Sequence, residues 1–190
     1  MARIFLVVGH SRTGSYCEAL ARSYERGAQA AGHETTLFVT SRMAFDPILR
    51  VGFSEIQQLE PDLQAAHDAL IAADHLVIFF PLWFSELPVI LQGFFNRVLQ
   101  PDIFPFYQSH KFPKLLKGKS ARVVVTMGMP GFVYLYWFRA HALKILRKIT
   151  LGGMGVAKIR TTIYGNVEGV GVKGRERWLK QVEELGRHAI

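Results

Sequence analysis

The sequence predicts a doubly wound α/β domain, in which a five-stranded parallel sheet carries helices on both faces. Three observations support this prediction. Five short runs of apolar and β-branched residues are bounded by turn residues, helix-like segments alternate with them, and a polar loop follows the first run. Strand and helix signals that alternate in this way are typical of parallel sheets. Ligands of such folds bind beyond the carboxyl ends of the strands.

The predicted strands are the apolar runs themselves. They lie at residues 3–8 (RIFLVV), 34–39 (ETTLFV), 75–80 (HLVIFF), 121–127 (ARVVVTM) and 157–165 (AKIRTTIYG). The predicted helices cover residues 15–31, 55–73, 88–99, 134–150 and 174–188. Residues 40–54 and 100–118 are predicted to be long connections, and loops of this length in compact domains are often functional.

Length and composition limit the class of protein. A chain of 190 residues with 49% hydrophobic residues suits one domain with a buried core, and we expect a single domain over residues 1–190. The single cysteine, Cys17, excludes an internal disulfide and favours a reducing compartment, so the cytoplasm is expected. No signal peptide is evident, and Pro81, Glu86 and Pro88 interrupt the longest apolar run before it reaches membrane-spanning length. We expect no membrane partner.

The net charge of +8 favours anionic partners. Lysines and arginines are nevertheless spread along the chain, with only mild clustering at residues 110–122, and no nucleic-acid-binding motif is present. We therefore expect a basic surface that attracts phosphorylated small molecules, and no nucleic-acid partner. The seven histidines form no H-E-x-x-H motif, so no metal site is predicted.

The loop after the first strand has the chemistry of an anion site, because the positive end of the following helix points outward there. Its polar and small residues are His10, Ser11, Arg12, Thr13, Gly14 and Ser15. A structural alternative is helix capping by Ser15 or Thr13, with Glu18 completing a capping box; both roles are compatible. A hydrolase nucleophile elbow at Ser11 is disfavoured, since Thr13 stands where that turn requires a small residue.

Two further loops are expected at the same edge of the sheet. After the third strand, Trp83 and Phe84 lie between two prolines, which suits a stiff apolar wall for a planar ring; ordinary packing is the alternative. The segment 126–141 after the fourth strand combines two glycines and a proline with five aromatic residues between Phe132 and Phe138, and a buried helix face is the alternative there. Together the three loops describe a site for a phosphorylated planar ring, and FMN has that shape.

Four motifs resemble those of the flavodoxin-like NAD(P)H:quinone oxidoreductases and their bacterial NAD(P)H-dependent oxidoreductase relatives. They are the H-S-x-x-x-S pattern of residues 10–15, AFDPIL at 44–49, FPLWFSELPVILQGFFNRVL at 80–99 and TMGMPGF at 126–132. The resemblance covers nearly the whole chain. It implies a flavodoxin-like sheet with strand order 2-1-3-4-5, and a flavin bound by the three loops.

The resemblance also implies which residues bind the flavin. They are His10, Ser15, Tyr16 and Cys17 at the phosphate, Pro81, Leu82, Trp83 and Phe84 beside the ring, and Thr126, Met127 and Gly128 as backbone contacts. The chemistry of the first loop adds Ser11, Arg12 and Gly14 to this cofactor-binding set. Tyr134 matches a family tyrosine that assists charge development on the reduced flavin, and His141 stands one position later than the family's histidine. These two are the predicted catalytic residues.

The implied function is transfer of two electrons from NAD(P)H through FMN to a quinone or similar small-molecule acceptor. FMN is favoured over FAD because the chain is shorter than the family members that carry FAD, which remains the alternative cofactor. A flavodoxin-type electron carrier is the alternative function, although such carriers are typically acidic, and a domain that has lost flavin is a third. Relatives often dimerise, so a homodimer is expected, with residues 132–138 as a dimer surface or an acceptor pocket. The G-x-G-x-x-G match at residues 169–174 is interpreted as a loop before the last helix, because too few residues follow it for a dinucleotide-binding unit.

Overall fold

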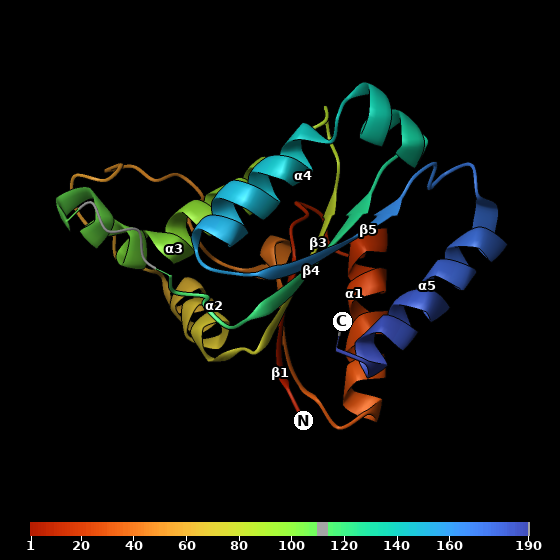
Figure 1. Cartoon of the computed structure of the whole chain (residues 1–190), viewed down its shortest axis with the longest axis horizontal. Coiled ribbons are helices and arrows are strands. Elements are labelled where there is room, and N and C mark those ends of the chain that lie inside the picture. Colours follow the sequence, from red (N-terminus) through yellow and green to blue (C-terminus); the bar gives the residue numbers. More distant parts are fainter. Residues whose placement is uncertain (110–113, 190) are drawn as a thin grey trace.

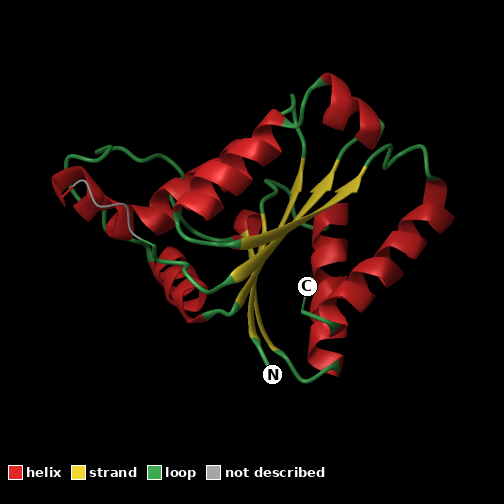
Figure 2. Cartoon of the chain, in the orientation of Figure 1, coloured by secondary structure: helices red, strands yellow, loops and turns green. Residues whose placement is uncertain are grey.

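Five parallel strands form the centre of the protein (Figures 1 and 2). The computed structural model describes residues 1–109 and 114–189, without the side chains of residues 105–109. The strands are β1 (Arg3–Val8), β2 (Glu34–Val39), β3 (His75–Pro81), β4 (Ser120–Thr126) and β5 (Lys158–Tyr164). Every neighbouring pair is parallel, and the order is β2-β1-β3-β4-β5. The predicted sheet and its 2-1-3-4-5 order are confirmed, with one-residue shifts at five strand limits, all in β3, β4 and β5.

Helices cover both faces of the sheet, as predicted (Figure 2). On one face lie α1 (Tyr16–Ala30) and α5 (Gly171–Arg187); on the other lie α2 (Pro61–Ala72), α3 (Val89–Ser109) and α4 (His141–Ile145). Successive strand residues alternate between two buried clusters, because side chains of a strand point to opposite faces. In β1, Phe5 and Val7 pack on the α2 and α3 side, whereas Leu6 packs against α1.

Helices α1 and α5 approach each other closely at two glycines. A Cβ atom on Gly27 would lie 1.9 Å from the carbonyl oxygen of Glu183, and one on Gly186 would lie 2.1 Å from that of Tyr24. Any larger residue at either position would force the helices apart. This contact fixes α5 against α1 and so positions the loop that follows β5.

The second and last helices begin at other residues than predicted. Helix α2 begins at Pro61 and not at residue 55, because a proline suits the first helical turn and disfavours helix at the residue before it. Helix α5 begins at Gly171, so residues 171–174 of the predicted loop 169–174 form its first turn. Both corrections move a helix boundary and leave the element order unchanged.

Helix α3 is longer than predicted, since it continues to Ser109 through residues predicted as a connection. Asp102, in this extension, accepts a hydrogen bond from the His67 ring of α2 at 2.8 Å, and Ile103 packs against the core. These contacts hold the extension to the body of the protein despite Pro101. Residues 110–113 of the predicted connection lie outside the described residues.

The predicted helix 134–150 is interrupted. A π-helical turn, η2 (Val133–Trp137), precedes α4, and a second π-helical segment, η3 (Leu146–Leu151), follows it. Between η2 and α4, Arg139 and Ala140 have left-handed backbone angles of φ 52 and 48 degrees. The wide turn allows Tyr134 to enter the core while its neighbours stay outside, so a buried helix face is wrong for this aromatic run.

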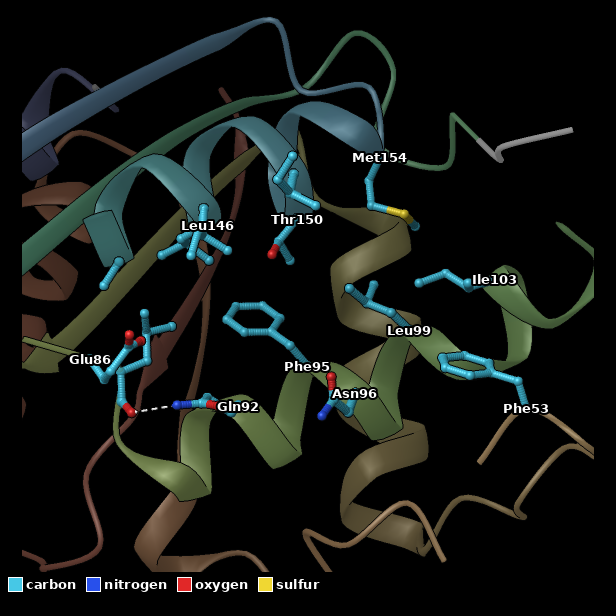
Figure 3. A pocket seen from close by; sticks show the side chains of 14 residues that line it. Phe53, Glu86, Gln92, Phe95, Asn96, Leu99, Ile103, Leu146, Thr150 and Met154 are labelled. Carbon is cyan, nitrogen blue, oxygen red and sulfur yellow. Dashed lines mark hydrogen bonds between the residues drawn. The ribbon is translucent and has the colours of Figure 1, made fainter. Parts of the chain in front are cut away.

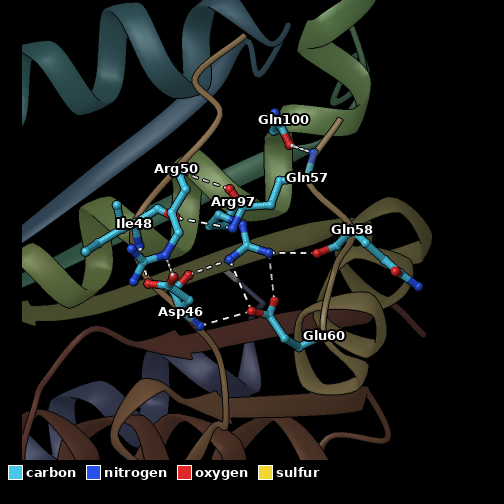
Figure 4. A network of polar contacts seen from close by, with 8 residues as sticks. All are labelled: Asp46, Ile48, Arg50, Gln57, Gln58, Glu60, Arg97 and Gln100. Atoms are coloured by element: carbon cyan, nitrogen blue, oxygen red, sulfur yellow. Dashed lines mark hydrogen bonds and ion pairs between the residues drawn. The ribbon is translucent and has the colours of Figure 1, made fainter. Parts of the chain in front are cut away.

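The long connection between β2 and α2 is held down by a buried arginine (Figure 4). Arg97 of α3 is fully buried, and its Nη2 donates to the Glu60 carboxylate and to the Gln58 carbonyl, each at 2.8 Å. Its Nη1 donates to the Asp46 carbonyl. The arginine therefore connects both ends of this loop to α3, and removing Glu60 would leave a buried charge without its ionic partner.

Candidate functional site

A cavity of about 570 Å³ lies at the carboxyl ends of β1, β3, β4 and β5. Its size falls within the range of small-molecule sites, about 300–1,000 Å³. Most of the predicted cofactor-binding residues line it: His10, Ser11, Arg12, Tyr16, Cys17, Pro81, Leu82, Trp83, Thr126, Met127 and Gly128. Gly14, Ser15 and Phe84 are predicted residues that do not line it. The fold thus brings the three predicted loops to one place.

The N-terminus of α1 faces this cavity, because Tyr16 and Cys17 of its first turn form part of the wall. Ser15 is the N-cap residue, and its hydroxyl accepts a hydrogen bond from the Glu18 amide at 3.2 Å. Capping by Ser15 is therefore confirmed. Gly14 adopts a left-handed conformation, φ 65 degrees, and its amide donates to the Glu18 carboxylate at 2.9 Å, one residue before the position expected in a capping box.

An ion pair between a buried carboxylate and an exposed arginine lies behind this loop. Glu18 is only 6% exposed, and its carboxylate accepts a hydrogen bond from Arg42 Nη2 at 2.7 Å. Arg42 belongs to the short helical turn after β2, η1 (Thr40–Arg42), so the sequence offered no sign of the pair. Its charge offsets that of a carboxylate that would otherwise repel an anion at the start of α1.

His10 connects the first loop to the third-strand loop. Its Nδ1 accepts a hydrogen bond from the Arg12 amide at 2.9 Å, and its ring meets that of Trp83 edge-on with centroids 5.0 Å apart. Burial, followed by the charge of Arg12, lowers the pKa of His10 below 6.5. The lowered pKa favours the uncharged ring, and with Nδ1 accepting, the proton of that form resides on Nε2.

The turn after β3 separates the two aromatic residues that the sequence treats as a pair. The backbones of Trp83 and Glu86 exchange hydrogen bonds of 3.2 and 2.8 Å, and the two residues between them have left-handed angles, φ 49 degrees at Phe84 and 64 degrees at Ser85. A bulky residue in this region is strained, and such strain often marks functional sites. Trp83 lines the cavity, whereas Phe84 is fully exposed on the outside of the turn.

The floor of the cavity joins α1 to β4. The thiol of Cys17 lies 3.2 Å from the hydroxyl of Thr126, and both residues are buried. Burial raises the pKa of Cys17 to about 12, so the group is a neutral thiol. Nearby, the Tyr16 hydroxyl donates to the Arg175 carbonyl at 2.8 Å, and burial raises the pKa of Tyr16 to about 12.

A fourth loop, after β5, contributes Val167 and Glu168 to the wall. The Val167 amide donates to the Met127 carbonyl at 3.2 Å, and a Cβ atom on Gly128 would lie 3.3 Å from the Glu168 carboxylate. Neither residue was predicted from the sequence. Because β5 is parallel to β4 and ends at the same edge of the sheet, the loop after β5 could have been expected to contribute to the site. The Met127 amide donates to the Tyr164 carbonyl at 2.9 Å, so it is already engaged.

The two predicted catalytic residues lie away from this wall. Tyr134 is fully buried, and its hydroxyl accepts a hydrogen bond from the Leu143 amide at 3.3 Å. His141 begins α4 and is exposed. Among the described residues no group of three or more His, Cys, Asp or Glu side chains could hold a metal ion, and no described helix has the length and apolarity needed to cross a membrane.

The fold and this cavity define a class of protein. A family model described as the flavodoxin-like fold matches residues 2–188, so the chain belongs to that family. An uncharacterized NAD(P)H oxidoreductase of Haemophilus influenzae is 25% identical over 175 residues, which are 87% of this chain and 84% of the relative. An FMN-dependent NADH:quinone oxidoreductase of Ruegeria pomeroyi is 26% identical over 147 residues, 68% of this chain and 72% of the relative.

A solved structure gives the same answer for the fold. NAD(P)H:quinone oxidoreductase from Methanothermobacter marburgensis superposes with a TM-score of 0.77 over 98% of this chain and 95% of its own, at 20% identity. The family resemblance stated from the sequence motifs is confirmed by these comparisons.

Proposed function

We propose that this protein is a flavin-dependent NAD(P)H oxidoreductase that passes two electrons from NAD(P)H through FMN to a quinone or similar acceptor. One observation carries the proposal: four strand-end loops converge on a single cavity with a helix N-terminus on one side and an indole on another. The relatives named as NAD(P)H and FMN-dependent NADH:quinone oxidoreductases support it.

The residues of the cavity fit FMN. Ser11 and Arg12, together with the N-terminus of α1, would hold its phosphate, because a helix N-terminus and a guanidinium both favour an anion. Pro81, Leu82 and Trp83 would support the ring, and Thr126 and Gly128 would border its edge. The neutral thiol of Cys17 adds no competing charge at the floor.

When bound, FMN accepts a hydride from NAD(P)H and yields two electrons to the acceptor, a chemistry that belongs to the cofactor. The chain contributes placement and electrostatics. His10, whose lowered pKa favours the uncharged form with its proton on Nε2, can donate a hydrogen bond without adding charge. A catalytic part for Tyr134 or His141 stays a prediction.

We also propose that two copies associate through the exposed aromatic face of η2. Phe132, Tyr136 and Trp137 are well exposed. Large apolar side chains that gather on a surface are typical of contacts with a partner. Sedimentation of the wild type and of Tyr136→Glu with Trp137→Glu tests the dimer, and we expect the wild type to sediment as a dimer and the variant as a monomer.

We also propose a cytoplasmic location, with which the single, buried and unpaired Cys17 is compatible.

The visible absorption spectrum of the FMN-loaded protein tests the function. We expect the flavin band to bleach on anaerobic addition of NADPH or NADH and to recover when a simple quinone is added. A flavin that binds and resists both nicotinamides would identify an electron carrier. A protein that binds no flavin would contradict the proposal altogether.

A further inference from the structure

A second cavity, of about 410 Å³, lies in the groove between α3 and the α4–η3 segment (Figure 3). Apolar side chains of the two segments face each other across it: Phe95, Leu99 and Ile103 from α3, and Ile145, Leu146 and Ile149 from α4 and η3. Among the described residues that line it, only Glu86 carries a charge. A mostly apolar, concave wall with few polar groups is typical of a small-molecule site.

The groove has a buried floor and an exposed apolar rim. Phe95, Leu99 and Leu146 form part of the floor and are at most 6% exposed. At the rim, Ile145 is 54% exposed and Ile149 is 66% exposed, so their apolar surface faces water. Covering that surface with an apolar ligand is favourable, because apolar area leaves water.

The groove begins beside the proposed cofactor site. Figure 3 shows Glu86 and Gln92 at one end, and Phe53 with Ile103 at the other. Glu86 is joined to Trp83, which lines the cofactor cavity, by the paired backbone hydrogen bonds of the turn after β3. The two cavities therefore share this four-residue turn, since Trp83 lines the cofactor cavity and Glu86 lines the groove.

We propose that this groove binds the apolar side chain of the electron acceptor, so that the acceptor class is quinones with an alkyl or prenyl substituent. The inference rests on the proposed function, since the ring must reach the flavin. The ring gains two electrons and two protons, as one hydride equivalent derived from NAD(P)H and one proton from solvent, and becomes a hydroquinone. The side chain takes no part in the reaction and contributes binding.

The test compares two benzoquinones with the same ring, one with only methyl and methoxy groups and one with an added decyl chain, using the FMN-loaded protein. We expect kcat/KM for the decyl quinone to be higher by about tenfold or more, because each buried methylene adds binding. Ile145→Asn with Ile149→Asn should remove this preference and leave the kcat/KM of the short quinone unchanged. Both side chains are exposed, so the variant should fold.

Ile56→Asn is the matched control, because Ile56 is 50% exposed and lines neither cavity. It should retain the preference for the decyl quinone. Equal kcat/KM for the two quinones in the wild type, or an unchanged preference in the double variant, overturns the inference. A change of oligomeric state in the double variant, seen by size-exclusion chromatography, also overturns it, because the groove would then be a contact between copies.

Failure of the proposed function gives a different result. If the FMN-loaded protein reduces neither quinone, the proposed acceptor is wrong. Equilibrium dialysis with the decyl quinone then tests whether the groove binds an apolar ligand. Weaker binding by the double variant than by Ile56→Asn supports an apolar ligand site, whereas equal binding excludes it.

Discussion

The thiol of Cys17 lies 3.2 Å from the hydroxyl of Thr126, although the two residues are 109 positions apart. Cys17 is in the first turn of α1, and Thr126 is the last residue of β4. Because β1 and β4 are separated in the sheet only by β3, their carboxyl ends deliver both side chains to the floor of the same cavity. This contact closes the cavity from below and buries the only cysteine.

The Cys17 thiol is expected to react slowly with thiol reagents. With a pKa of about 12, about one thiol in ten thousand is ionised at pH 8, and the thiolate is the reactive form. The rate with Ellman's reagent should therefore be lower by about a hundredfold or more in the native protein than in urea. Rapid, complete labelling of the native protein would show that the floor of the cavity is open.

Ser11→Asp should weaken FMN binding by about tenfold or more. Ser11 is exposed and lines the cavity at the loop expected to hold phosphate, so a carboxylate there would repel the anion. Ser11→Asn is the matched control, since it has nearly the same shape without the charge. Fluorescence titration of FMN measures both, and equal affinities for the two variants would place the phosphate elsewhere.

Trp83→Ala should weaken FMN binding, whereas Phe84→Ala should leave the affinity for FMN nearly unchanged. Trp83 lines the cavity and packs edge-on against His10, but Phe84 points away and is fully exposed. Loss of an aromatic contact to a planar ring is worth about 1 kcal/mol, or roughly fivefold in affinity. A larger effect of Phe84→Ala than of Trp83→Ala on the FMN dissociation constant would reverse the assignment.

His75 should make stability depend on pH. Burial, followed by the charges of Arg122 and Arg160, lowers its pKa to about 4 from 6.5. Between these two values the unfolded chain binds a proton that the folded protein does not, so stability is highest above about pH 7 and decreases as the pH falls. The free energy of unfolding should drop by about 2 kcal/mol from pH 7 to pH 5 through this residue.

His75→Gln tests this dependence, because glutamine can still hydrogen-bond to Ser120, which the His75 ring contacts at 2.7 Å. Urea unfolding at pH 7 and pH 5 should show a smaller difference in this variant than in the wild type. The same difference in both proteins would assign the pH dependence to other groups.

The element order and the location of the cavity could be predicted from the sequence. The apolar runs of β1 and β3 are continuous, because strands of a parallel sheet are buried on both faces, and this signal is local. Parallel strands also end at a common edge, so the loops at His10, Trp83 and Thr126 could be expected to lie together. Helix ends were predicted less well where a long-range contact decided them, as at Asp102, whose partner His67 lies on another helix.

Only the tertiary structure decided which side chains face the cavity. Trp83 and Phe84 are neighbours in sequence, and the left-handed turn sends one inward and the other outward. Glu168 joins the wall because β5 lies beside β4, and Arg42 neutralises Glu18 because β2 lies beside β1. The sequence by itself determined the strands, the sheet and the shared edge through local hydrophobic patterns. Pairings between distant residues depend on side-chain packing and backbone angles, which no local pattern contains.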